Sequence, residues 1–407
     1  MERFGLLGRR LGHSLSPQIH GYFGEYPYTL IEKEPEDLAA FFANPTFRAI
    51  NVTIPYKKDV MAYCDELDEY AQRIGSVNTI RFDGDVVRGY NTDYTGFRYL
   101  LEKNNVPVAG RKVLVLGSGG SAVTACCVLR DMQAADVVVI SRSGENNYDN
   151  LHLHADAGLI VNTTPVGMFP HNLQAPVELA AFSLCEAVVD IIYNPLKTQL
   201  LLDAERLGML AVNGLEMLVA QGKRAAEIFF DKPIDDAVVE STVQAMVRRF
   251  ENVVLIGMPG CGKSTVGKLL AERLQKPFVD TDALVVEAAG KPIPDLIAES
   301  GETVFRDAEQ AAVYEAGQRL GHVIATGGGA ILREANRLAL AQNAQVVFLR
   351  RPPENLATEG RPLSKDKAAL EALYEKRLPI YTAMADLTID VCGDPAVTCE
   401  RVLGELR

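Results

Sequence analysis

The sequence predicts two consecutive α/β units, each built on a parallel β-sheet with helices on its faces. Short β-branched apolar runs alternate with helical patterns from about residue 110 onward, which is typical of parallel sheets. Two glycine-rich segments, 117–122 and 257–264, each follow such a run and lead into a helical pattern. The length of 407 residues also exceeds what one core normally holds. We therefore expect two enzymes joined end to end.

The composition narrows the class of protein. Apolar residues make up 48% and charged residues 23%, as in globular proteins. The net charge of −12 argues against a nucleic-acid partner, so anionic ligands must be attracted by local cations and helix N-termini. The seven cysteines show neither a disulfide framework nor a zinc spacing, which predicts a reducing compartment. With no signal peptide or membrane-spanning run recognised, we expect a cytoplasmic protein without a membrane partner, and a homo-oligomer stays open.

The expected elements follow from periodicity, caps and turn residues. Near the N-terminus they are a strand at 4–8, a helix opened by Ser16 as its N-cap and Pro17 at its first position, a strand at 49–54, and a helix that begins near Tyr94 behind the cap 91–93. Strands at 112–116, 136–140, 157–161 and 187–192, a helix up to about residue 132 and a helix over 214–249 follow. The second unit opens with a strand at 252–256 and a helix at 265–274, with no flexible linker near 249–251.

The first glycine segment predicts a dinucleotide site, although glycines also serve simple tight turns. Its residues are Gly117, Ser118, Gly119, Gly120, Ser121 and Ala122. The next strand ends at Ser141, Arg142 and Ser143, where such a site selects its ribose. An arginine between two hydroxyls suits a 2′-phosphate, so the sequence favours NADP over NAD; the alternative is a solvated surface arginine.

Polar residues in the first 95 positions suggest a substrate site. Ser14 and Ser16 lie two apart, so in an extended chain both hydroxyls could donate to one carboxylate. Taken alone, Lys57 would be a surface residue and Asp93 a helix cap.

In combination, seven ordered motifs resemble those of shikimate dehydrogenase over residues 1 to about 245. They are His13-Ser14-Leu15-Ser16-Pro17, Asn51-Val52-Thr53-Ile54-Pro55-Tyr56-Lys57, Gly75-Ser76-Val77-Asn78-Thr79, Gly89-Tyr90-Asn91-Thr92-Asp93, Asn162-Thr163-Thr164-Pro165-Val166-Gly167-Met168, Tyr193-Asn194-Pro195 and Gly214-Leu215-Glu216-Met217-Leu218-Val219-Ala220-Gln221.

The resemblance implies NADPH-dependent reduction of 3-dehydroshikimate to shikimate, and the reverse reaction. It implies that Lys57 and Asp93 form the catalytic pair, that Ser14 and Ser16 hold the substrate carboxylate, that Thr53, Asn78, Asp93, Tyr193 and Gln221 contact the ring, and that Gly214 adjoins the cofactor. A lysine beside a carboxylate can deliver the proton that the ketone oxygen needs.

The second glycine segment fits the pattern G-x-x-x-x-G-K-[ST] of nucleoside triphosphatases and small kinases. Its phosphate-binding residues are Gly260, Cys261, Gly262, Lys263, Ser264 and Thr265, and Ser264 is expected to ligate Mg²⁺. Asp280 and Asp282 follow at the end of the next apolar strand. We expect Asp280 to bind the metal through water and Asp282 to accept a hydrogen bond from the acceptor hydroxyl.

This order resembles shikimate kinase from residue 252 to about 392. The motifs are Asp280-Thr281-Asp282, Gly301-Glu302-Thr303-Val304-Phe305-Arg306 with Glu309, Thr326-Gly327-Gly328-Gly329-Ala330, Gly360-Arg361-Pro362-Leu363 and Arg377-Leu378-Pro379-Ile380-Tyr381. The resemblance implies that Arg306 and Arg377 pair with the shikimate carboxylate, that Asp282, Gly328 and Gly329 contact its hydroxyls, and that Arg361 on a lid joins Lys263 at the transferred phosphate.

The combined expectation is a bifunctional enzyme that uses NADP(H), ATP and Mg²⁺. Its fold would be a shikimate-dehydrogenase-like substrate domain and a Rossmann-type NADP domain, followed by a P-loop kinase domain of the α/β class. The expected boundaries are 1–249 for the dehydrogenase, with 1–100 and about 214–249 binding substrate and 101–213 binding NADP, and 250–407 for the kinase.

Two departures from the families bear on the nucleotide sites: the connection after Arg142 is short, and Thr358 and Glu359 stand where an arginine often precedes the lid. We expect a reduced NADP clasp and weaker contacts to the ATP base, or help from Arg350 and Arg351. Alternative functions are a quinate-type dehydrogenase with another small-molecule kinase, such as one for gluconate, and a nucleotide-binding sensor without turnover.

Overall fold

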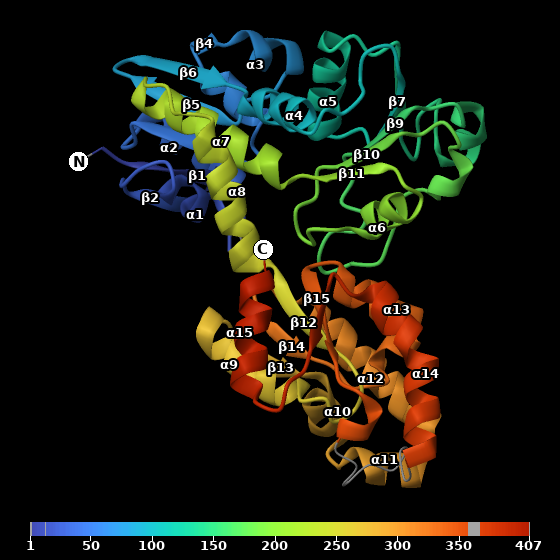
Figure 1. Ribbon diagram of the computed structural model, residues 1–407. Coiled ribbons are helices and arrows are strands. Elements are labelled where there is room, and N and C mark those ends of the chain that lie inside the picture. The colour runs from blue at the N-terminus through green and yellow to red at the C-terminus, as the bar shows by residue number, and fades with distance from the viewer. Residues whose placement is uncertain (1, 13, 357–366, 407) are drawn as a thin grey trace. The chain divides into compact units, whose positions relative to one another are not determined.

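The computed structural model describes residues 2–12, 14–356 and 367–406, which form three β-sheets (Figure 1). By its internal contacts the chain divides into two units. The first comprises Met1–Val166, Ala175–Tyr193 and Asp203–Ala245, and the second comprises Gly167–Gln174, Asn194–Leu202 and Met246–Arg407. The first two sheets lie in the first unit and the third sheet lies in the second.

The first sheet is mixed and has the strand order β2-β1-β3-β5-β6-β4. Its strands are β1 (Phe4–Gly8), β2 (Tyr28–Glu32), β3 (Ala49–Val52), β4 (Glu66–Leu67), β5 (Thr79–Asp83) and β6 (Val86–Tyr90), accompanied by α1 (Ser16–Gly21), α2 (Leu38–Ala43) and α3 (Glu69–Ile74). β1 pairs in parallel with both β2 and β3, whereas β3 and β5 pair antiparallel. Because β1 and β3 run in parallel, the segments that follow them leave the sheet at the same edge.

The second sheet is parallel and has the order β11-β10-β9-β7-β8. Its strands are β7 (Lys112–Leu116), β8 (Asp136–Ile140), β9 (Leu159–Asn162), β10 (Ala187–Asp190) and β11 (Leu210–Asn213). α4 (Thr92–Lys103) and α5 (Gly120–Asp131) pack on this sheet, and α6 (Gln199–Arg206) connects β10 to β11. α7 (Leu215–Phe230) contacts α1, α4, β3 and β5, and α8 (Ala237–Phe250) follows it in the chain. The strand order reverses beside β7, and ligands of such sheets bind at the carboxyl ends of the strands at this switch point. The glycine segment 117–122 begins there.

The third sheet is also parallel and has the order β13-β14-β12-β15-β16. Its strands are β12 (Asn252–Ile256), β13 (Phe278–Asp280), β14 (Val323–Ala325), β15 (Ala344–Arg350) and β16 (Leu387–Asp390), with helices α9 (Lys263–Leu274), α10 (Thr281–Ala289), α11 (Ile293–Ser300), α12 (Glu302–Gln318), α13 (Glu334–Ala341), α14 (Lys367–Met384) and α15 (Pro395–Glu405). Short 3-10 helices span Pro35–Asp37, Asp59–Tyr63, Tyr148–His154, Leu179–Ala181, Ala330–Leu332 and Pro353–Asn355.

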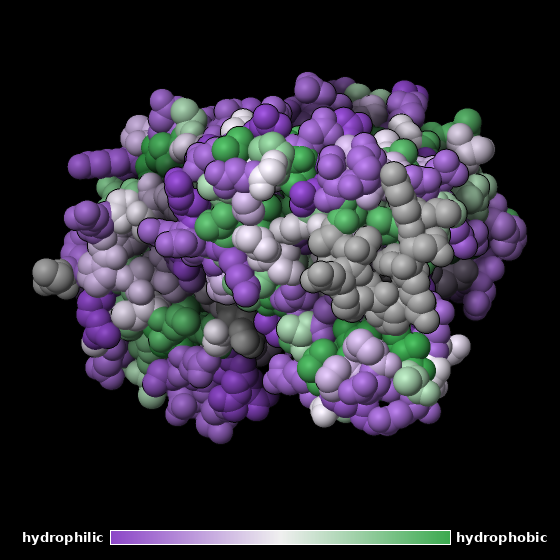
Figure 2. All heavy atoms as spheres, turned by 60° about the horizontal axis from the view of Figure 1, so that its bottom comes forward, coloured by the Kyte–Doolittle hydropathy of each residue, from purple (hydrophilic) through white to green (hydrophobic). Residues whose placement is uncertain are grey.

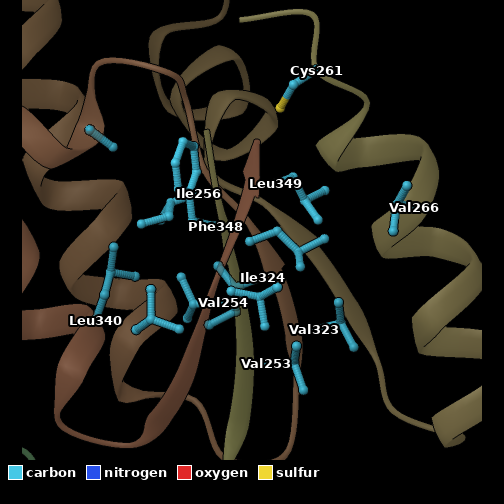
Figure 3. Packing of buried hydrophobic residues seen from close by; sticks show 14 of the residues in the cluster. Val253, Val254, Ile256, Cys261, Val266, Val323, Ile324, Leu340, Phe348 and Leu349 are labelled. Carbon is cyan, nitrogen blue, oxygen red and sulfur yellow. The ribbon is translucent and has the colours of Figure 1, made fainter. Parts of the chain in front are cut away.

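The core of the second unit surrounds β12. All residues of β12 are buried, as expected for a central parallel strand covered on both faces. Val254 and Ile256 of this strand lie close to Phe348 of β15 and Leu340 of α13, while Val266 of α9 belongs to the same cluster (Figure 3). This packing holds the end of β12, and therefore the start of the second glycine segment, in a fixed place.

The predicted elements are mostly present, with several errors at their ends. The strand expected at 49–54 ends at Val52, the strand expected at 157–161 spans Leu159–Asn162, and the strand expected at 187–192 ends at Asp190. The helix expected from Tyr94 begins at Thr92, and the helix expected at 265–274 begins at Lys263. The single helix expected over 214–249 is wrong, because Asp231 adopts a left-handed conformation that separates α7 from α8.

The surface is largely polar. On the face shown in Figure 2, hydrophilic residues cover most of the described surface and hydrophobic ones form small patches. Among the described residues, no helix combines the length and the apolar character needed to cross a membrane.

Gly96 tests the packing of α4 on α7, the two helices that carry Asp93 and Gln221. A Cβ at Gly96 would lie 2.6 Å from the Met217 carbonyl oxygen, and this helix backbone cannot yield easily. We expect Gly96→Ala to reduce the free energy of unfolding by roughly 1–3 kcal/mol in denaturant titrations. As a control, Gly21→Ala adds a methyl group where nothing lies within 4 Å and should leave stability nearly unchanged. Equal stability of the two variants would contradict the close packing.

Candidate active sites

A lysine–carboxylate pair forms the centre of the first site. Lys57 Nζ donates a hydrogen bond to Asp93 Oδ2 over 2.6 Å. The Asn78 amide donates to the other oxygen of Asp93, Oδ1, over 2.9 Å. Both side chains of the pair are mostly covered, with 29% of Lys57 and 17% of Asp93 exposed. The charges therefore attract each other in a partly desolvated place, which is suitable for moving a proton.

The element ends explain why these residues meet. Asp93 lies in the first turn of α4, whose N-cap Asn91 accepts a hydrogen bond from the Tyr94 backbone N–H. The Val77 backbone N–H donates to the Lys57 carbonyl oxygen over 2.7 Å, which ties the segment after β3 to the segment before β5. The lysine and Asn78 thus approach the start of α4 together.

Gln221 joins this site from α7. The Thr92 hydroxyl donates to Gln221 Oε1 over 3.3 Å, and the same hydroxyl accepts from Asn78 Nδ2 over 3.0 Å. The structure therefore places Gln221, Asn78, Asp93 and Lys57 within one hydrogen-bonded group, although they come from four separate motifs.

Ser14 and Ser16 are adjacent, but the expected cap is wrong. The N-cap of α1 is Leu15, which has no capping side chain, and Ser16 is the first helical residue. Ser14 instead lies outside the helix, where its Oγ accepts from the Ser16 backbone N–H at 3.3 Å and donates to Ser16 Oγ at 3.2 Å. The two hydroxyls are therefore hydrogen-bonded to each other, although Leu15 between them is helical and not extended as the spacing argument assumed.

Two further predicted ring contacts occupy strand ends. Thr53 directly follows β3, and its backbone N–H donates to the Leu7 carbonyl oxygen over 2.9 Å. Tyr193 lies beyond the end of β10, where burial raises the pKa of its phenol above the ordinary value. Tyr193 therefore remains protonated and can donate a hydrogen bond near neutral pH.

The first glycine segment leaves an open cradle at the N-terminus of α5. Gly119 is the N-cap of this helix, and a Cβ at either Gly119 or Gly120 would meet nothing within 4 Å. Gly117 has a φ of +105°, and a Cβ there would lie 2.9 Å from Thr163 Oγ1, so only glycine fits that turn. An open face of backbone N–H groups at a helix N-terminus favours phosphate. Ser118, Ser121 and Ala122 complete the segment.

Arg142 is exposed just after β8, between Ser141 and Ser143. The short connection that follows is ordered by its own contacts: Asn147 caps the 3-10 helix Tyr148–His154 by accepting from the Asp149 backbone N–H. On the other side of the cradle, a Cβ at Gly214 would collide with the Ile191 backbone, so this turn also requires glycine.

The second glycine segment forms a phosphate loop whose lysine is folded onto its own backbone. Lys263 Nζ donates to the carbonyl oxygens of Gly257 and Met258 at 2.8 and 2.9 Å, and only 8% of the residue is exposed. Gly262 has a φ of +101° at the N-cap of α9. Gly260, Cys261 and Thr265 lie on either side of this turn. Backbone N–H groups and one cation thus surround a site for phosphate oxygens.

An oxygen pair suited to a hard cation lies next to this loop. Ser264 Oγ donates to Asp280 Oδ2 over 2.6 Å, and Asp280 Oδ1 accepts from the Asp282 backbone N–H. Mg²⁺ prefers such oxygen ligands, together with waters and substrate phosphates.

Asp282 is an unusual carboxylate. Burial, together with repulsion by Asp280, raises its pKa to about 6, Glu309 adds to the rise, and Lys263 and Arg306 oppose it. A carboxyl with this pKa can accept a proton or a hydrogen bond from an alcohol near neutral pH.

The glycines 327–329 lie against the residues predicted to bind the substrate that accepts the phosphoryl group. A Cβ at Gly327 would lie 2.5 Å from Asp282 Oδ1, and a Cβ at Gly329 would collide with the Arg306 guanidinium. Arg377 donates to the Gly328 carbonyl oxygen over 2.9 Å. The segment after β14 therefore brings Asp282, Arg306 and Arg377 together, in addition to reversing the chain direction.

The two arginines are held differently. Arg306 pairs with the buried Glu309 at 2.8 Å and with Glu302 at 3.1 Å. Arg377 is 4% exposed, and its Nε atom has no hydrogen-bond partner among the residues that the structure describes. A buried guanidinium with an unused donor is prepared for an anionic ligand, since leaving it unpaired costs free energy.

A cavity of about 560 Å³ opens beside the phosphate loop. Ser264, Thr265 and Lys268 of α9 line one side, and Asp394, Pro395 and Ala396 at the N-terminus of α15 line the other. Arg350 does not face it freely, because its guanidinium forms a bidentate ion pair with Asp390 at 2.6 and 2.8 Å. The predicted lid residue Arg361 lies outside the described residues, as do Thr358 and Glu359.

Comparison with known proteins identifies both parts of the chain. Residues 6–80 match the family model of the shikimate dehydrogenase substrate binding domain, and residues 259–407 match that of shikimate kinase. A shikimate dehydrogenase (NADP(+)) of Clostridium perfringens is 35% identical over 271 residues, which cover 61% of this chain and that relative's whole length.

The chain belongs to the shikimate dehydrogenase family. Among solved structures, a chorismate mutase/shikimate 5-dehydrogenase fusion protein from Clostridium acetobutylicum is 36% identical, with a TM-score of 0.58. It covers 60% of this chain and 97% of its own. A shikimate 5-dehydrogenase from Thermus thermophilus in complex with NADP(H) and shikimate is 30% identical, with a TM-score of 0.55, over 60% of this chain and 99% of its own.

This member of the shikimate dehydrogenase family carries a shikimate kinase domain at its C-terminal end, which confirms the predicted fusion and fold class. Both enzyme activities and the use of NADP and ATP are therefore supported together.

The structure adds residues that sequence reasoning did not assign. Thr92 links Asn78 to Gln221, Glu309 holds Arg306, and the Tyr381 hydroxyl donates to the same Gly328 oxygen as Arg377 over 2.6 Å. Thr92, Glu309 and Tyr381 all lie inside quoted motifs. All three residues are exposed by 1% or less. This burial indicates their importance, and it could not be recognised from the sequence.

The raised pKa of Asp282 has a measurable consequence. As pH falls through about 6, Asp282 is protonated and can no longer take up the proton of the acceptor hydroxyl. We expect kcat/KM of the kinase reaction to decline below about pH 6. The substitution Asp280→Asn removes a neighbouring negative charge and should therefore shift this acidic limb of the pH profile to lower pH. Initial rates from pH 5 to 8 measure both. An unchanged limb in Asp280→Asn would contradict the coupling.

Proposed function

We propose that one chain performs two consecutive reactions on one small carboxylic acid: reduction of 3-dehydroshikimate to shikimate, then phosphorylation of shikimate. The main observation in support of the proposal is that the chain contains two sites with similar sets of functional groups. In one, Lys57 and Asp93 form an ion pair beyond β3, and Ser14 and Ser16 supply two hydroxyls beyond the parallel strand β1. In the other, Asp282, Arg306 and Arg377 converge on the glycines 327–329 next to a phosphate loop. Each site combines groups for an anion with groups for an alcohol or ketone.

In the reduction, Ser14 and Ser16 donate to the substrate carboxylate, while Asn78 and Gln221 orient the ring. Lys57 delivers a proton to the ketone oxygen as it becomes an alcohol, and the hydrogen bond to Asp93 keeps the ammonium in place. Such proton transfer typically contributes about 10²–10⁴-fold to the rate. Thr53 and Tyr193 supply further polar contacts from the ends of β3 and β10.

The open cradle over Gly119 and Gly120 suits a dinucleotide pyrophosphate, and exposed Arg142 suits a 2′-phosphate. We assign Ser118, Ser121 and Ala122 to the same cradle, with Ser141, Ser143 and Gly214 at its margins. NADPH, when bound, supplies the hydride for the reduction.

In the phosphoryl transfer, Arg306 and Arg377 hold the substrate carboxylate and Asp282 accepts a hydrogen bond from the acceptor hydroxyl. Lys263 leaves the carbonyl oxygens of Gly257 and Met258 to bind phosphate oxygens. Cations placed there are most effective because the transition state spreads negative charge over those oxygens. The cavity beside α9 is the proposed place for the base of ATP.

Ser264 and Asp280 are the proposed metal ligands, since their oxygens lie 2.6 Å apart beside the phosphate loop. Mg²⁺, when bound, neutralises charge on the phosphates and fixes their geometry. On the basis of its motif alone, we propose that Arg361 belongs to a lid and joins Lys263 at the transferred phosphate. The proposed boundaries remain 1–249 for the dehydrogenase and 250–407 for the kinase.

Two variants of the full chain test the proposal by separating the reactions. Lys57→Met removes the proton donor, so shikimate oxidation with NADP should fall by about 10²-fold or more while ATP-dependent phosphorylation of shikimate continues. Lys263→Met should abolish phosphorylation and leave oxidation intact. Absorbance of NADPH and a coupled ADP assay measure the two rates.

Each variant serves as the folding control of the other. Full oxidation by Lys57→Met would refute the first assignment, and full phosphorylation by Lys263→Met would refute the second. Parallel assays with quinate and gluconate decide between shikimate and the alternative substrates.

A further inference from the structure

A row of polar side chains continues from the lysine–carboxylate pair into the first sheet. Asn78 lies behind Asp93, and its Oδ1 accepts from the Thr79 hydroxyl over 3.3 Å. The Thr79 hydroxyl accepts in turn from Asn51 Nδ2 over 3.1 Å. Asn51 Oδ1 accepts from the Tyr28 hydroxyl over 2.8 Å. The row thus crosses from β5 to β3 and on to β2.

One assignment of donors and acceptors satisfies every group in this row. Tyr28 has one hydroxyl proton, which it gives to Asn51 Oδ1, so the Asn51 amide nitrogen must face Thr79. The Thr79 hydroxyl accepts that proton and gives its own to Asn78 Oδ1. The Asn78 amide nitrogen is then left to face Asp93 Oδ1, and Asp93 Oδ2 to face Lys57.

Burial makes the row rigid. Thr79 is fully buried, and Asn78 and Asn51 are 3% and 6% exposed. Inverting the Asn78 amide would turn its nitrogen toward the Thr92 backbone N–H and its oxygen toward Asp93 Oδ1, and mismatched buried groups of this kind cost free energy. The Thr92 backbone N–H adds a second bond to Asn78 Oδ1 over 2.7 Å and holds the same orientation.

The outer end of the row adjoins the carboxylate-binding serines. Burial raises the pKa of Tyr28 well above that of an ordinary tyrosine, against a smaller lowering by the Ser16 hydroxyl, so Tyr28 stays a donor. Its ring stacks on His20 of α1 at 4.2 Å between centroids. Burial lowers the pKa of His20 to about 3, so this ring is neutral and adds no charge to the row.

We propose that Tyr28, Asn51 and Thr79 are positioning residues for the reduction, which set the orientation of Asn78 and thereby assign one oxygen of Asp93 to Lys57. The inference rests on the proposed dehydrogenase function and deepens it. None of the three residues needs to contact the substrate, because each acts through Asn78. Losing the row lets the Asn78 amide and the Asp93 carboxylate turn away from the geometry that the proton transfer requires.

The test uses substitutions that remove single hydroxyl groups from the full chain. Tyr28→Phe and Thr79→Val should each lower kcat for shikimate oxidation about 10-fold with the KM for shikimate changed less than about 2-fold. Thr79→Ser restores the hydroxyl and should recover most of the loss. With shikimate deuterated at the carbon that loses hydride, the isotope effect on kcat should increase in the slow variants because the chemical step becomes more limiting.

Tyr94→Phe is the matched control. Tyr94 follows Asp93 in α4, but its hydroxyl donates away from the site to Asp131 Oδ2 over 2.7 Å. It should lower the melting temperature without the fall in kcat. Phosphorylation rates of the same preparations should stay unchanged.

Equal losses of kcat in Tyr28→Phe and Tyr94→Phe, or failure of Thr79→Ser to recover activity, would overturn the positioning role. So would full activity of Tyr28→Phe and Thr79→Val. An inactive parent protein would instead refute the proposed dehydrogenase function itself.

Discussion

Parallel strands that end at one edge of a sheet are the constraint on which both sites depend. β1 and β3 run in parallel, so Ser14, Thr53 and Lys57 all arise beyond the same edge of the first sheet. In the third sheet, β12, β13 and β14 are parallel, and their ends lead to Lys263, Asp280 and the glycines 327–329. Residues far apart in the sequence therefore meet because the backbone pairing places strand ends together.

Both sites also require side chains to approach the backbone closely, and glycine makes this possible. Residues 327–329 admit Asp282 and Arg306 only because no Cβ is present there, and Gly117 allows the turn that begins the dinucleotide cradle. Charge is then concentrated locally. A chain of net charge −12 repels anions at long range, so Lys57, Lys263 and the partly paired arginines must supply the attraction at short range.

The motifs and the presence of most strands could be predicted from the sequence because they depend on local residue types and short spacings. The strands at 4–8, 112–116, 136–140 and 252–256 were correct for this reason. The cap at Leu15 and the break at Asp231 were missed, since local patterns fitted a neighbouring alternative equally well. The contact of Asn51 with Thr79 joins residues on two separate strands, and such a partner becomes apparent only when distant segments pack.

The central claim is that one chain carries one substrate through both reactions. Its most direct test is to incubate the purified protein with 3-dehydroshikimate, ATP and Mg²⁺, add NADPH, and follow NADPH absorbance and phosphorus NMR together. The account predicts no phosphorylated product before NADPH is added, and afterwards equal amounts of oxidised NADPH, ADP and shikimate 3-phosphate. Oxidation of NADPH without shikimate 3-phosphate, or phosphorylation of 3-dehydroshikimate before NADPH is present, would contradict it.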